Sequence, residues 1–193
     1  MNQKSNRHFA ITGGIGSGKS FVCQQLEARG IRVYDCDQAA KRLMRTDEKL
    51  QHNLCQLVGE ELYKDHVLQK HILAEYLLAS EANKQAVNNI IHPVVAQDFL
   101  CSGYEWLESA ILFESGFNKR VVFDTIVCVV APRATRLQRI MQRDGISEER
   151  AAEWIDCQMS QEEMEQSSDF VINNDGQADL NRQLDQLLSF MNT

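Results

Sequence analysis

The stretch GGIGSGKS, residues 13–20, decides the fold class that this chain is expected to adopt. It matches GxxxxGK followed by Ser or Thr, a pattern in which a glycine-rich loop and the N-terminus of the next helix hold a phosphate chain. In that pattern Lys19 neutralises the outer phosphates, and the Ser20 hydroxyl is a ligand of Mg²⁺. The rival glycine pattern of dinucleotide folds, GxGxxG, fails because Lys19 occupies its last position. The loop therefore predicts a nucleoside triphosphate site, and the residues expected to contact the nucleotide are Gly14, Ile15, Gly16, Ser17, Gly18, Lys19, Ser20 and Phe21.

The segments on either side of the loop have the patterns that such a site requires. HFAIT, residues 8–12, predicts a buried strand, and residues 20–29 predict a helix that ends at Gly30. Residues 31–35 predict a second strand. Together these segments predict a βαβ unit with parallel strands.

Helical patterning covers nearly all of residues 38–103 and indicates a helical insert. Within it, helices are expected around residues 41–58, 68–78 and 82–100. Outside it, strands are expected at residues 106–113, 121–131 and 169–173, and helices at residues 133–143, 148–164 and 178–191. The sequence thus predicts a single α/β domain over residues 8–193.

Composition and charge exclude several classes of protein. The formal net charge of -7 argues against a general nucleic-acid binder, and the longest apolar run, residues 125–131, is far shorter than a membrane helix. The six cysteines form no CxxC pair and have no nearby histidine at zinc-ligand spacing, which indicates reduced thiols. We expect a cytoplasmic protein that does not insert into membranes, and its oligomeric state is left open.

The segments that identify other nucleotide-binding classes are missing. A GTPase would carry DxxG and NKxD, and neither occurs in the sequence. The remaining class is the small-molecule kinases, which need a group that accepts the proton of the acceptor hydroxyl and a basic lid over the phosphates.

The acceptor side is predicted at Asp35-Cys36-Asp37, at the end of the second expected strand. Alternate residues of an extended segment point the same way, so both carboxylates are expected to face one site. The alternative is that Asp37 caps a helix that starts at Gln38. The second metal ligand is left open among Asp35, Asp37 and Glu108.

The lid is predicted from Arg136, Arg139 and Arg143, which fall within roughly 60° of one another around a helix. Such a stripe can neutralise the charge on a transferred phosphoryl group. The alternative is a solvated helix face.

Further segments along the chain resemble the dephospho-CoA kinase family, from about Phe9 to the last expected helix. These segments are ITGGIGSGKS, VYDCDQAAKRL, IIHPVV, ILFE, RIMQRDG and DFVINNDG. The resemblance implies a P-loop NTPase three-layer sandwich with a five-stranded parallel sheet, in which residues 38–103 bind the acceptor and residues 133–165 form the lid. It also implies transfer of the γ-phosphoryl group of ATP to the 3′-hydroxyl of dephospho-CoA, the last step of coenzyme A biosynthesis, with ATP and Mg²⁺.

Roles for individual residues follow from the matching positions. The resemblance implies that Asp37 is the general base and that Lys19 and Arg143 stabilise the phosphates during catalysis. It adds Arg139 and Asn174 as nucleotide contacts, with Asn174 on the adenine side.

The same match places His92 and Pro93, with Asp37, at the acceptor. Taken alone, His92 is more typical of a helix end or a core. The alternatives to this function are another P-loop kinase, acting on a nucleoside monophosphate or a shikimate-like alcohol, and a non-catalytic nucleotide-binding switch.

The chain departs from the family pattern at a few positions. Phe21 replaces a usual threonine, and Glu108 stands in a segment that replaces D-x-P, which leaves open a role for Glu108 or Glu114. Met164 stands where many relatives have a basic residue, so one lid contact to phosphate is missing or supplied elsewhere.

Overall fold

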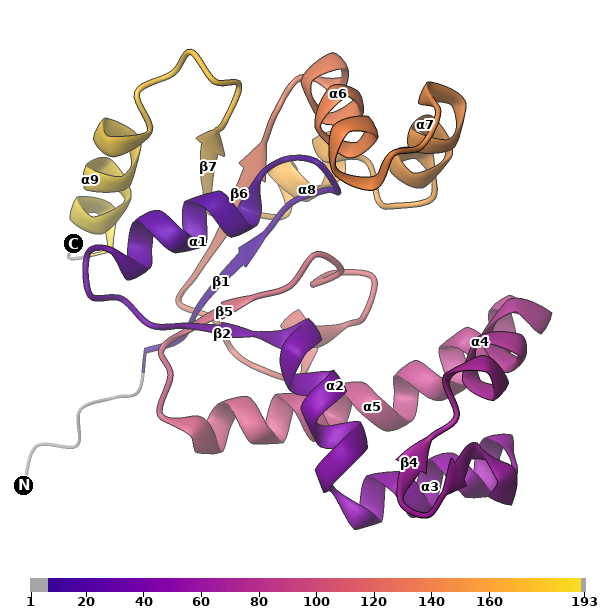
Figure 1. Ribbon diagram of the computed structural model, residues 1–193. Helices are drawn as coiled ribbons and strands as arrows, with labels where there is room; N and C mark the ends of the chain where they lie inside the picture. Colours follow the sequence, from indigo (N-terminus) through magenta and orange to yellow (C-terminus); the bar gives the residue numbers. More distant parts are fainter. Residues whose placement is uncertain (1–6, 192–193) are drawn as a thin grey trace, which may run out of the picture. The chain divides into compact units, whose positions relative to one another are not determined.

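The computed structural model describes residues 7–191, so the predicted domain extends two residues past the described range. The chain divides into two compact units (Figure 1). One unit contains residues 7–34 and 104–191, and the other contains residues 35–103.

The first unit is built on a five-stranded parallel sheet with the strand order β2-β5-β1-β6-β7. Its strands are β1 (Phe9–Thr12), β2 (Val33–Asp35), β5 (Trp106–Glu108), β6 (Thr125–Val130) and β7 (Phe170–Asn173). β1 pairs in parallel with both β5 and β6, and β6 pairs in parallel with β7. Because parallel strands end at one edge, the segments that follow β1, β6 and β7 meet there. The α/β fold and the parallel sheet are confirmed.

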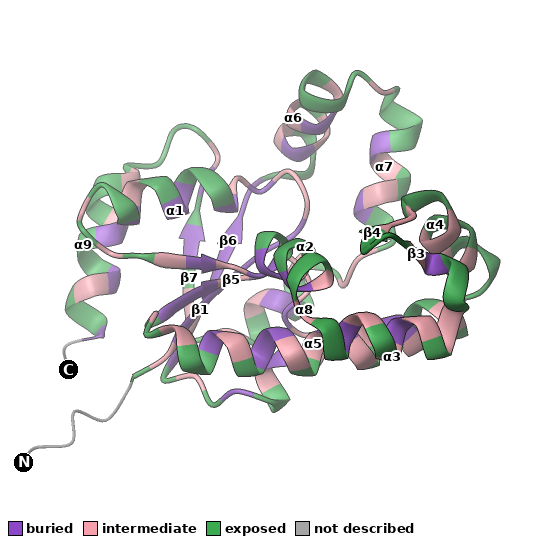
Figure 2. Ribbon diagram, turned by 60° about the horizontal axis from the view of Figure 1, so that its bottom comes forward, coloured by how far each residue is buried: buried purple, intermediate pink, exposed green. Residues whose placement is uncertain are grey.

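Helices cover both faces of this sheet. They are α1 (Lys19–Glu27) and α9 (Leu180–Phe190) on one face and α8 (Gln161–Gln166) on the other. α6 (Arg133–Asp144) and α7 (Glu148–Asp156) pack against each other in a separate apolar cluster that includes Ile15 of the loop. Alternate residues of β6 divide between the two faces: Val127 and Val129 pack in the core that α1 and α9 share, while Cys128 packs with Met164 of α8. Figure 2 shows the strands of this sheet largely buried and α9 with an exposed outer side. The loop after β1 therefore lies beside the segments that follow β6 and β7, which come from distant parts of the sequence.

The second unit is mainly helical, as predicted. It contains α2 (Cys36–Thr46), α3 (Glu48–Val58), η1 (Glu60–Leu62), α4 (Lys70–Ala79) and α5 (Glu81–Ser102). The predicted helix over residues 41–58 is interrupted at Asp47, whose carboxylate accepts a hydrogen bond from the backbone N–H of Leu50 at 2.8 Å and so begins a new helix.

A small antiparallel hairpin in the second unit was not predicted. It consists of β3 (Tyr63–Lys64) and β4 (Val67–Leu68), joined by Asp65 and His66. Both connecting residues have positive φ angles, 49° and 63°, without being glycine. Short hairpins are usually recognised by an Asn-Gly or Asp-Gly dipeptide at the turn. The dipeptide here is Asp-His, so the sequence did not predict the hairpin.

Three further expected elements differ from their predicted bounds by more than two residues or are divided. The strand expected at residues 106–113 ends at Glu108. The Ser109 N–H still donates to the Ile11 carbonyl at 3.0 Å, and the chain turns from Ala110 onward. The strand expected at residues 121–131 begins only at Thr125. The helix expected at residues 148–164 is split at residues 157–160, where Ser160 and Glu163 form a capping box that starts α8.

Two further features concern the cysteines and the character of the helices. All six cysteines are free thiols. Within residues 7–191, none of the helices has the length and apolar character that a membrane span requires.

Candidate active site

The loop between β1 and α1 has the geometry of a phosphate-binding loop. Gly18 is the N-cap of α1, with a φ of 90°, so the helix starts directly from the loop. A Cβ on Gly13 would lie 2.2 Å from the Val129 carbonyl oxygen, and one on Gly18 would lie 2.1 Å from Asn174 Nδ2. These approaches explain why the loop needs glycine at both positions. The predicted residues 14–20 thus lie together around the N-terminus of α1.

Lys19 lies over the loop rather than in solvent. Its side chain is only 8% exposed, and Nζ donates to the Gly13 carbonyl at 2.7 Å. The cation is therefore held where a phosphate chain bound in the loop would meet it. Phe21, also predicted to contact the nucleotide, is 50% exposed.

Ser20 fits the metal role that the sequence predicts. Its side chain is exposed in the first turn of α1 and makes no hydrogen bond within residues 7–191. No group of three or more His, Cys, Asp or Glu side chains in this range is arranged to hold a metal. Mg²⁺ suits such a site, because it commonly binds through one or two protein oxygens together with substrate phosphates and water.

Arg139 and Asn174 converge on the loop from different elements. Asn174 Nδ2 and Arg139 Nη1 both donate to the Ser17 carbonyl, at 2.8 Å and 3.1 Å. Arg139 Nη2 also donates to the Asn174 carbonyl at 2.9 Å. The Ser17 carbonyl of the loop is therefore held by hydrogen bonds from both α6 and the segment after β7. Contact of these two residues with the nucleotide stays a prediction.

Ile15 is held from a second direction. Its N–H donates to Gln158 Oε1 at 2.7 Å, and its carbonyl accepts from Arg136 Nε at 2.9 Å. Its side chain packs against the apolar cluster of α6 and α7, which includes Ile140. Gln158 was missed, because nothing in a single sequence distinguishes one glutamine 143 positions away from the residue that it contacts.

The arginine stripe of α6 divides into two kinds of residue. Arg136 and Arg139 face the loop, whereas the side chain of Arg143 is 60% exposed and pairs with its neighbour Asp144 at 2.7 Å. The solvated-face alternative therefore describes Arg143 in this structure. Its role in catalysis stays a prediction.

The environment of Cys128, on β6, shifts the pKa of its thiol. Burial and the charge of Glu165 raise the pKa of its thiol to about 12, while Lys19 and Arg136 act in the opposite direction. The thiol is protonated at neutral pH and is not a nucleophile. Burial, together with Arg133, also lowers the pKa of Arg136.

The acceptor-side aspartates differ from the sequence prediction. α2 begins at Cys36, so the extended segment ends at Asp35 and does not carry Asp37 to the same face. Asp35 is the helix cap: its Oδ1 accepts a hydrogen bond from the Gln38 N–H at 2.9 Å. The suggestion that Asp37 caps this helix is therefore wrong. Asp37 lies in the first turn of α2 with an exposed side chain.

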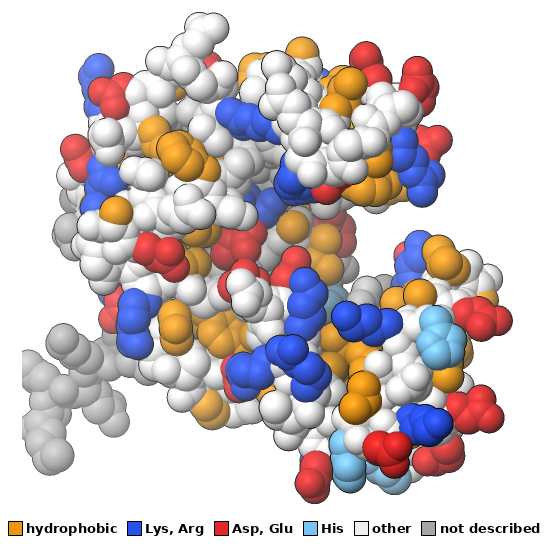
Figure 3. Space-filling model, in the orientation of Figure 1, with side chains coloured by type: hydrophobic (Ala, Val, Ile, Leu, Met, Phe, Trp, Pro, Cys, Tyr) orange, Lys and Arg blue, Asp and Glu red, His pale blue; other side chains and the backbone are white. Residues whose placement is uncertain are grey.

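Two cations share the face of α2 on which Asp37 lies. Lys41 and Arg45 follow Asp37 at intervals of four residues, and all three are exposed. Figure 3 shows Lys and Arg side chains gathered over α2. By contrast, Arg42 is paired with Asp98 of α5 at 2.5 Å.

His92 and Pro93 lie in the middle of the long helix α5. His92 is half-buried, and Pro93 lines two open grooves of about 400 and 580 Å³ between α3 and α5, together with Lys49, Asn53 and Val94. Their contact with an acceptor stays a prediction.

The positions that depart from the family pattern also have definite places. Glu114 accepts a hydrogen bond from the Met159 N–H at 3.1 Å and so fixes the connection between α7 and α8. Met164 is fully buried against Cys128, so this position faces the sheet rather than solvent. Glu108 is the half-buried last residue of β5.

Comparison with known proteins decides the family. A family model for dephospho-CoA kinase matches residues 7–179, which include the loop, α2, α5 and α6. The chain belongs to the dephospho-CoA kinase family. The resemblance predicted from the sequence is thereby confirmed.

Curated dephospho-CoA kinases resemble the chain over most of its length. One from Bacteroides fragilis is 44% identical over 188 residues, which cover 94% of this chain and 91% of the relative. Another from Porphyromonas gingivalis is 42% identical and covers 81% of this chain and 78% of the relative.

Solved structures agree with this dephospho-CoA kinase fold. A Thermus thermophilus protein matches with a TM-score of 0.79 at 30% identity, covering 95% of this chain and 97% of that one. Dephospho-CoA kinase from Campylobacter jejuni matches with a TM-score of 0.65 at 25% identity, covering 94% and 95%. A shikimate kinase from Bacteroides thetaiotaomicron, at 12% identity and a TM-score of 0.57, shares the fold alone.

Proposed function

We propose that this chain transfers the terminal phosphoryl group of ATP to the ribose 3′-hydroxyl of dephospho-CoA, forming coenzyme A and ADP. The observation that carries the proposal is its similarity, over 94% of its length, to a dephospho-CoA kinase. The phosphate loop supports the nucleotide part of the proposal independently, because Lys19 and the start of α1 suit a triphosphate. The proposed reaction completes coenzyme A.

The nucleotide is assigned to the loop of the first unit. Backbone N–H groups around the start of α1 would bind the phosphates, and Lys19 would neutralise charge on the group in transfer. Arg139 and Asn174, which both donate to the Ser17 carbonyl, would contact the nucleotide beside the loop. Arg143 would leave its exposed pair with Asp144 to reach the phosphates.

The Ser20 hydroxyl would be the metal ligand supplied by the loop. Bound Mg²⁺ supplies charge neutralisation on the phosphate oxygens. The chain's own contribution is to hold the triphosphate in line with the acceptor oxygen.

Asp37 is assigned as the general base. Its carboxylate is exposed and is not used as a helix cap, so it is available to accept the proton of the 3′-hydroxyl as the new P–O bond forms. Asp35 has one carboxylate oxygen in the cap, which leaves Asp37 as the better candidate.

The helical unit is assigned to the acceptor. Lys41 and Arg45, on the face of α2 that carries Asp37, suit an acceptor with a diphosphate group. His92 and Pro93 of α5 would line the acceptor site, and residues 133–165 would act as the lid. The free cysteines suit a reducing compartment, which we propose is the cytoplasm.

The test is ADP release from Mg-ATP in the presence of dephospho-CoA, with AMP, CMP, UMP and shikimate in parallel and the product identified by mass. The proposal expects stimulation by dephospho-CoA alone and a product that gains one phosphate. Stimulation by another acceptor would leave the phosphate loop assignment intact and overturn the substrate. ATP binding without stimulation by any acceptor would favour a nucleotide-binding switch.

A further inference from the structure

Arg136 is a buried cation with an incomplete set of partners. It is 5% exposed, and within residues 7–191 Nε is the one atom of its side chain with a hydrogen bond, to the Ile15 carbonyl at 2.9 Å. In the same range no carboxylate lies within 4.0 Å of its guanidinium. Asp156 and Glu162 affect it electrostatically only from farther away. Burying a cation is costly unless an anion compensates for the lost water.

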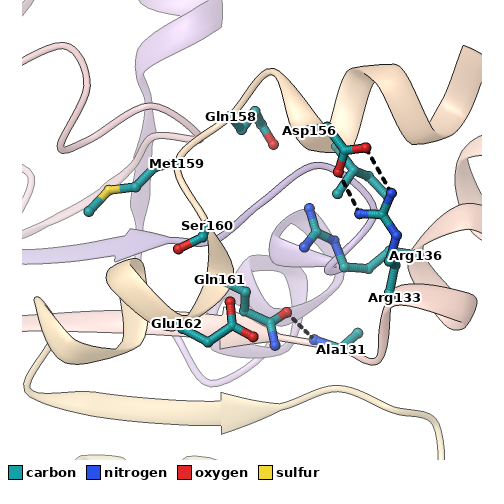
Figure 4. Close-up of a pocket in the computed structure, with 10 residues that line it drawn as sticks. Ala131, Arg133, Arg136, Asp156, Gln158, Met159, Ser160, Gln161 and Glu162 are labelled. Carbon is teal, nitrogen blue, oxygen red and sulfur yellow. Dashed lines mark hydrogen bonds and ion pairs between the residues drawn. The ribbon is translucent and has the colours of Figure 1, made fainter.

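The guanidinium lies between the phosphate loop and a pocket. A Cβ on Gly14 would be 2.3 Å from Arg136 Nη2, so the group lies directly against the loop. On its other side is a cavity of about 280 Å³ between the end of β6 and the segments around α7 and α8. Figure 4 shows the guanidinium of Arg136 pointing into the space that Gln158, Ser160 and Gln161 surround.

Among the other side chains that line this pocket, Arg133, Asp156, Gln158 and Gln161 have hydrogen-bond partners, and Glu162 is an exposed carboxylate, which cannot donate to an anion. Arg133 makes two hydrogen bonds with Asp156, at 2.7 and 2.9 Å (Figure 4). Gln161 Oε1 accepts from the Ala131 N–H at 3.3 Å, and Gln158 Oε1 accepts from Ile15. The Nη1 and Nη2 atoms of Arg136 therefore remain as the cationic donors that a ligand can use.

We propose that Arg136 binds a phosphate oxyanion in this pocket, through Nη1 and Nη2, while Nε stays bonded to the loop. A guanidinium is suited to this task, because its planar donors match two oxygens of one phosphate. The residue thereby joins the phosphate loop to the ligand. It supplies a phosphate contact from α6 that does not depend on position 164, where Met164 is buried against the sheet.

The choice of ligands rests on the proposed function. It offers two ligands that could supply the phosphate. One is ATP, through its terminal phosphate, and the other is dephospho-CoA, through its diphosphate. The two sources separate in binding experiments, since ADP lacks the terminal phosphate and dephospho-CoA can be titrated alone.

The experiment measures dissociation constants by calorimetry for Mg-ATP, Mg-ADP and dephospho-CoA, each alone and at one ionic strength. Arg136→Met keeps a side chain of similar length and removes the charge and all donors. Gln158→Met removes the other hydrogen bond to Ile15 without changing charge. Arg182→Met removes an exposed cation of α9, outside residues 133–165, and so matches the change in net charge.

The expected result is loss of affinity for one ligand. Arg136→Met should weaken Mg-ATP by about 10- to 100-fold and leave Mg-ADP within about twofold, if the terminal phosphate is bound. The same loss for dephospho-CoA, with both nucleotides unaffected, assigns its diphosphate instead. Arg182→Met should change none of the three constants.

Two results would overturn the proposal. Equal losses for Mg-ATP and Mg-ADP, matched by Gln158→Met, would show that Arg136 acts only through Ile15. Unchanged binding of all three ligands would show that the pocket holds no phosphate. Melting curves for each variant distinguish a binding defect from a folding defect. These experiments measure binding and not turnover. If the chain used a different acceptor, the proposed function would be wrong, but the comparison of Mg-ATP with Mg-ADP would still test the role of Arg136.

Discussion

The phosphate loop and the first turns of α2 carry the two halves of the proposed reaction, and they are built in opposite ways. In the loop, the Ser17 carbonyl accepts bonds from two side chains and Ile15 is held at both its N–H and its carbonyl. On α2, Asp37, Lys41 and Arg45 are exposed and make no such bonds within the described residues. Under the proposed assignment, the triphosphate site is formed in advance, whereas the acceptor groups gain their partners from the ligand.

Replacing Lys19 tests the loop most severely. Lys19→Met should lower kcat/KM by about 10³-fold, because it removes the cation that meets the phosphates in a site where charge is poorly screened. Steady-state kinetics with Mg-ATP and dephospho-CoA measure the effect. A change of less than about tenfold would mean that another group neutralises the transferred phosphate.

Replacing Asp37 tests the acceptor side. Asp37→Asn should lower kcat by about 10²- to 10³-fold through loss of the base, while the dissociation constant of ATP stays unchanged. The melting temperature should fall by less than for loss of the helix cap, because Asp37 is exposed in the first turn of α2 and does not cap it.

Asp35 is the matched control for Asp37. Asp35→Ala removes the cap of α2 and should cost about 1 kcal/mol of stability. For a chain of this length that loss lowers the melting temperature by about 2–4 °C. If Asp37→Asn lowered the melting temperature and Asp35→Ala did not, the assigned cap would be wrong.

Two arginines of α6, Arg139 and Arg143, allow a residue that contacts the loop to be compared with an exposed one on the same helix. Arg139→Met should weaken ATP binding by about tenfold and lower the melting temperature, because its guanidinium bonds to both the loop and the Asn174 carbonyl. Arg143→Met should leave the melting temperature unchanged, since exposed ion pairs contribute little. Calorimetry and thermal melts measure both variants, and equal destabilisation by the two would contradict the division of the stripe.

The smallest expected effect is a pH dependence at the turn after Asn174. Hydrogen bonds from the backbone N–H groups of Ala178 and Gln177 hold the pKa of Asp175 below its ordinary value of 3.8. A depressed folded-state pKa means that the carboxylate stabilises the fold above pH 3.8 and loses this effect as the pH falls through the folded-state pKa. Denaturant unfolding between pH 6 and 2 should therefore show a shallower acid decline for Asp175→Asn, and an unaltered slope would count against the turn.

The local parts of this site were predictable from sequence, and the long-range parts were not. The loop could be predicted because its glycines, Lys19 and Ser20 act within eight consecutive residues. Asp37 was placed at the right junction, but the start of α2 at Cys36 was not anticipated, and this start moves the cap to Asp35. Gln158 contacts the loop across 143 positions, and a contact that depends on the assembled sheet leaves no local pattern.

The measurement that tests the central claim most directly is the position of the transferred phosphate. Wild-type protein would be incubated with Mg-ATP and dephospho-CoA, and the product fragmented by mass spectrometry and compared with coenzyme A. The account predicts a single product with the new phosphate on the ribose 3′-oxygen. Phosphate on another oxygen, or ATP consumption with dephospho-CoA unchanged, would contradict it.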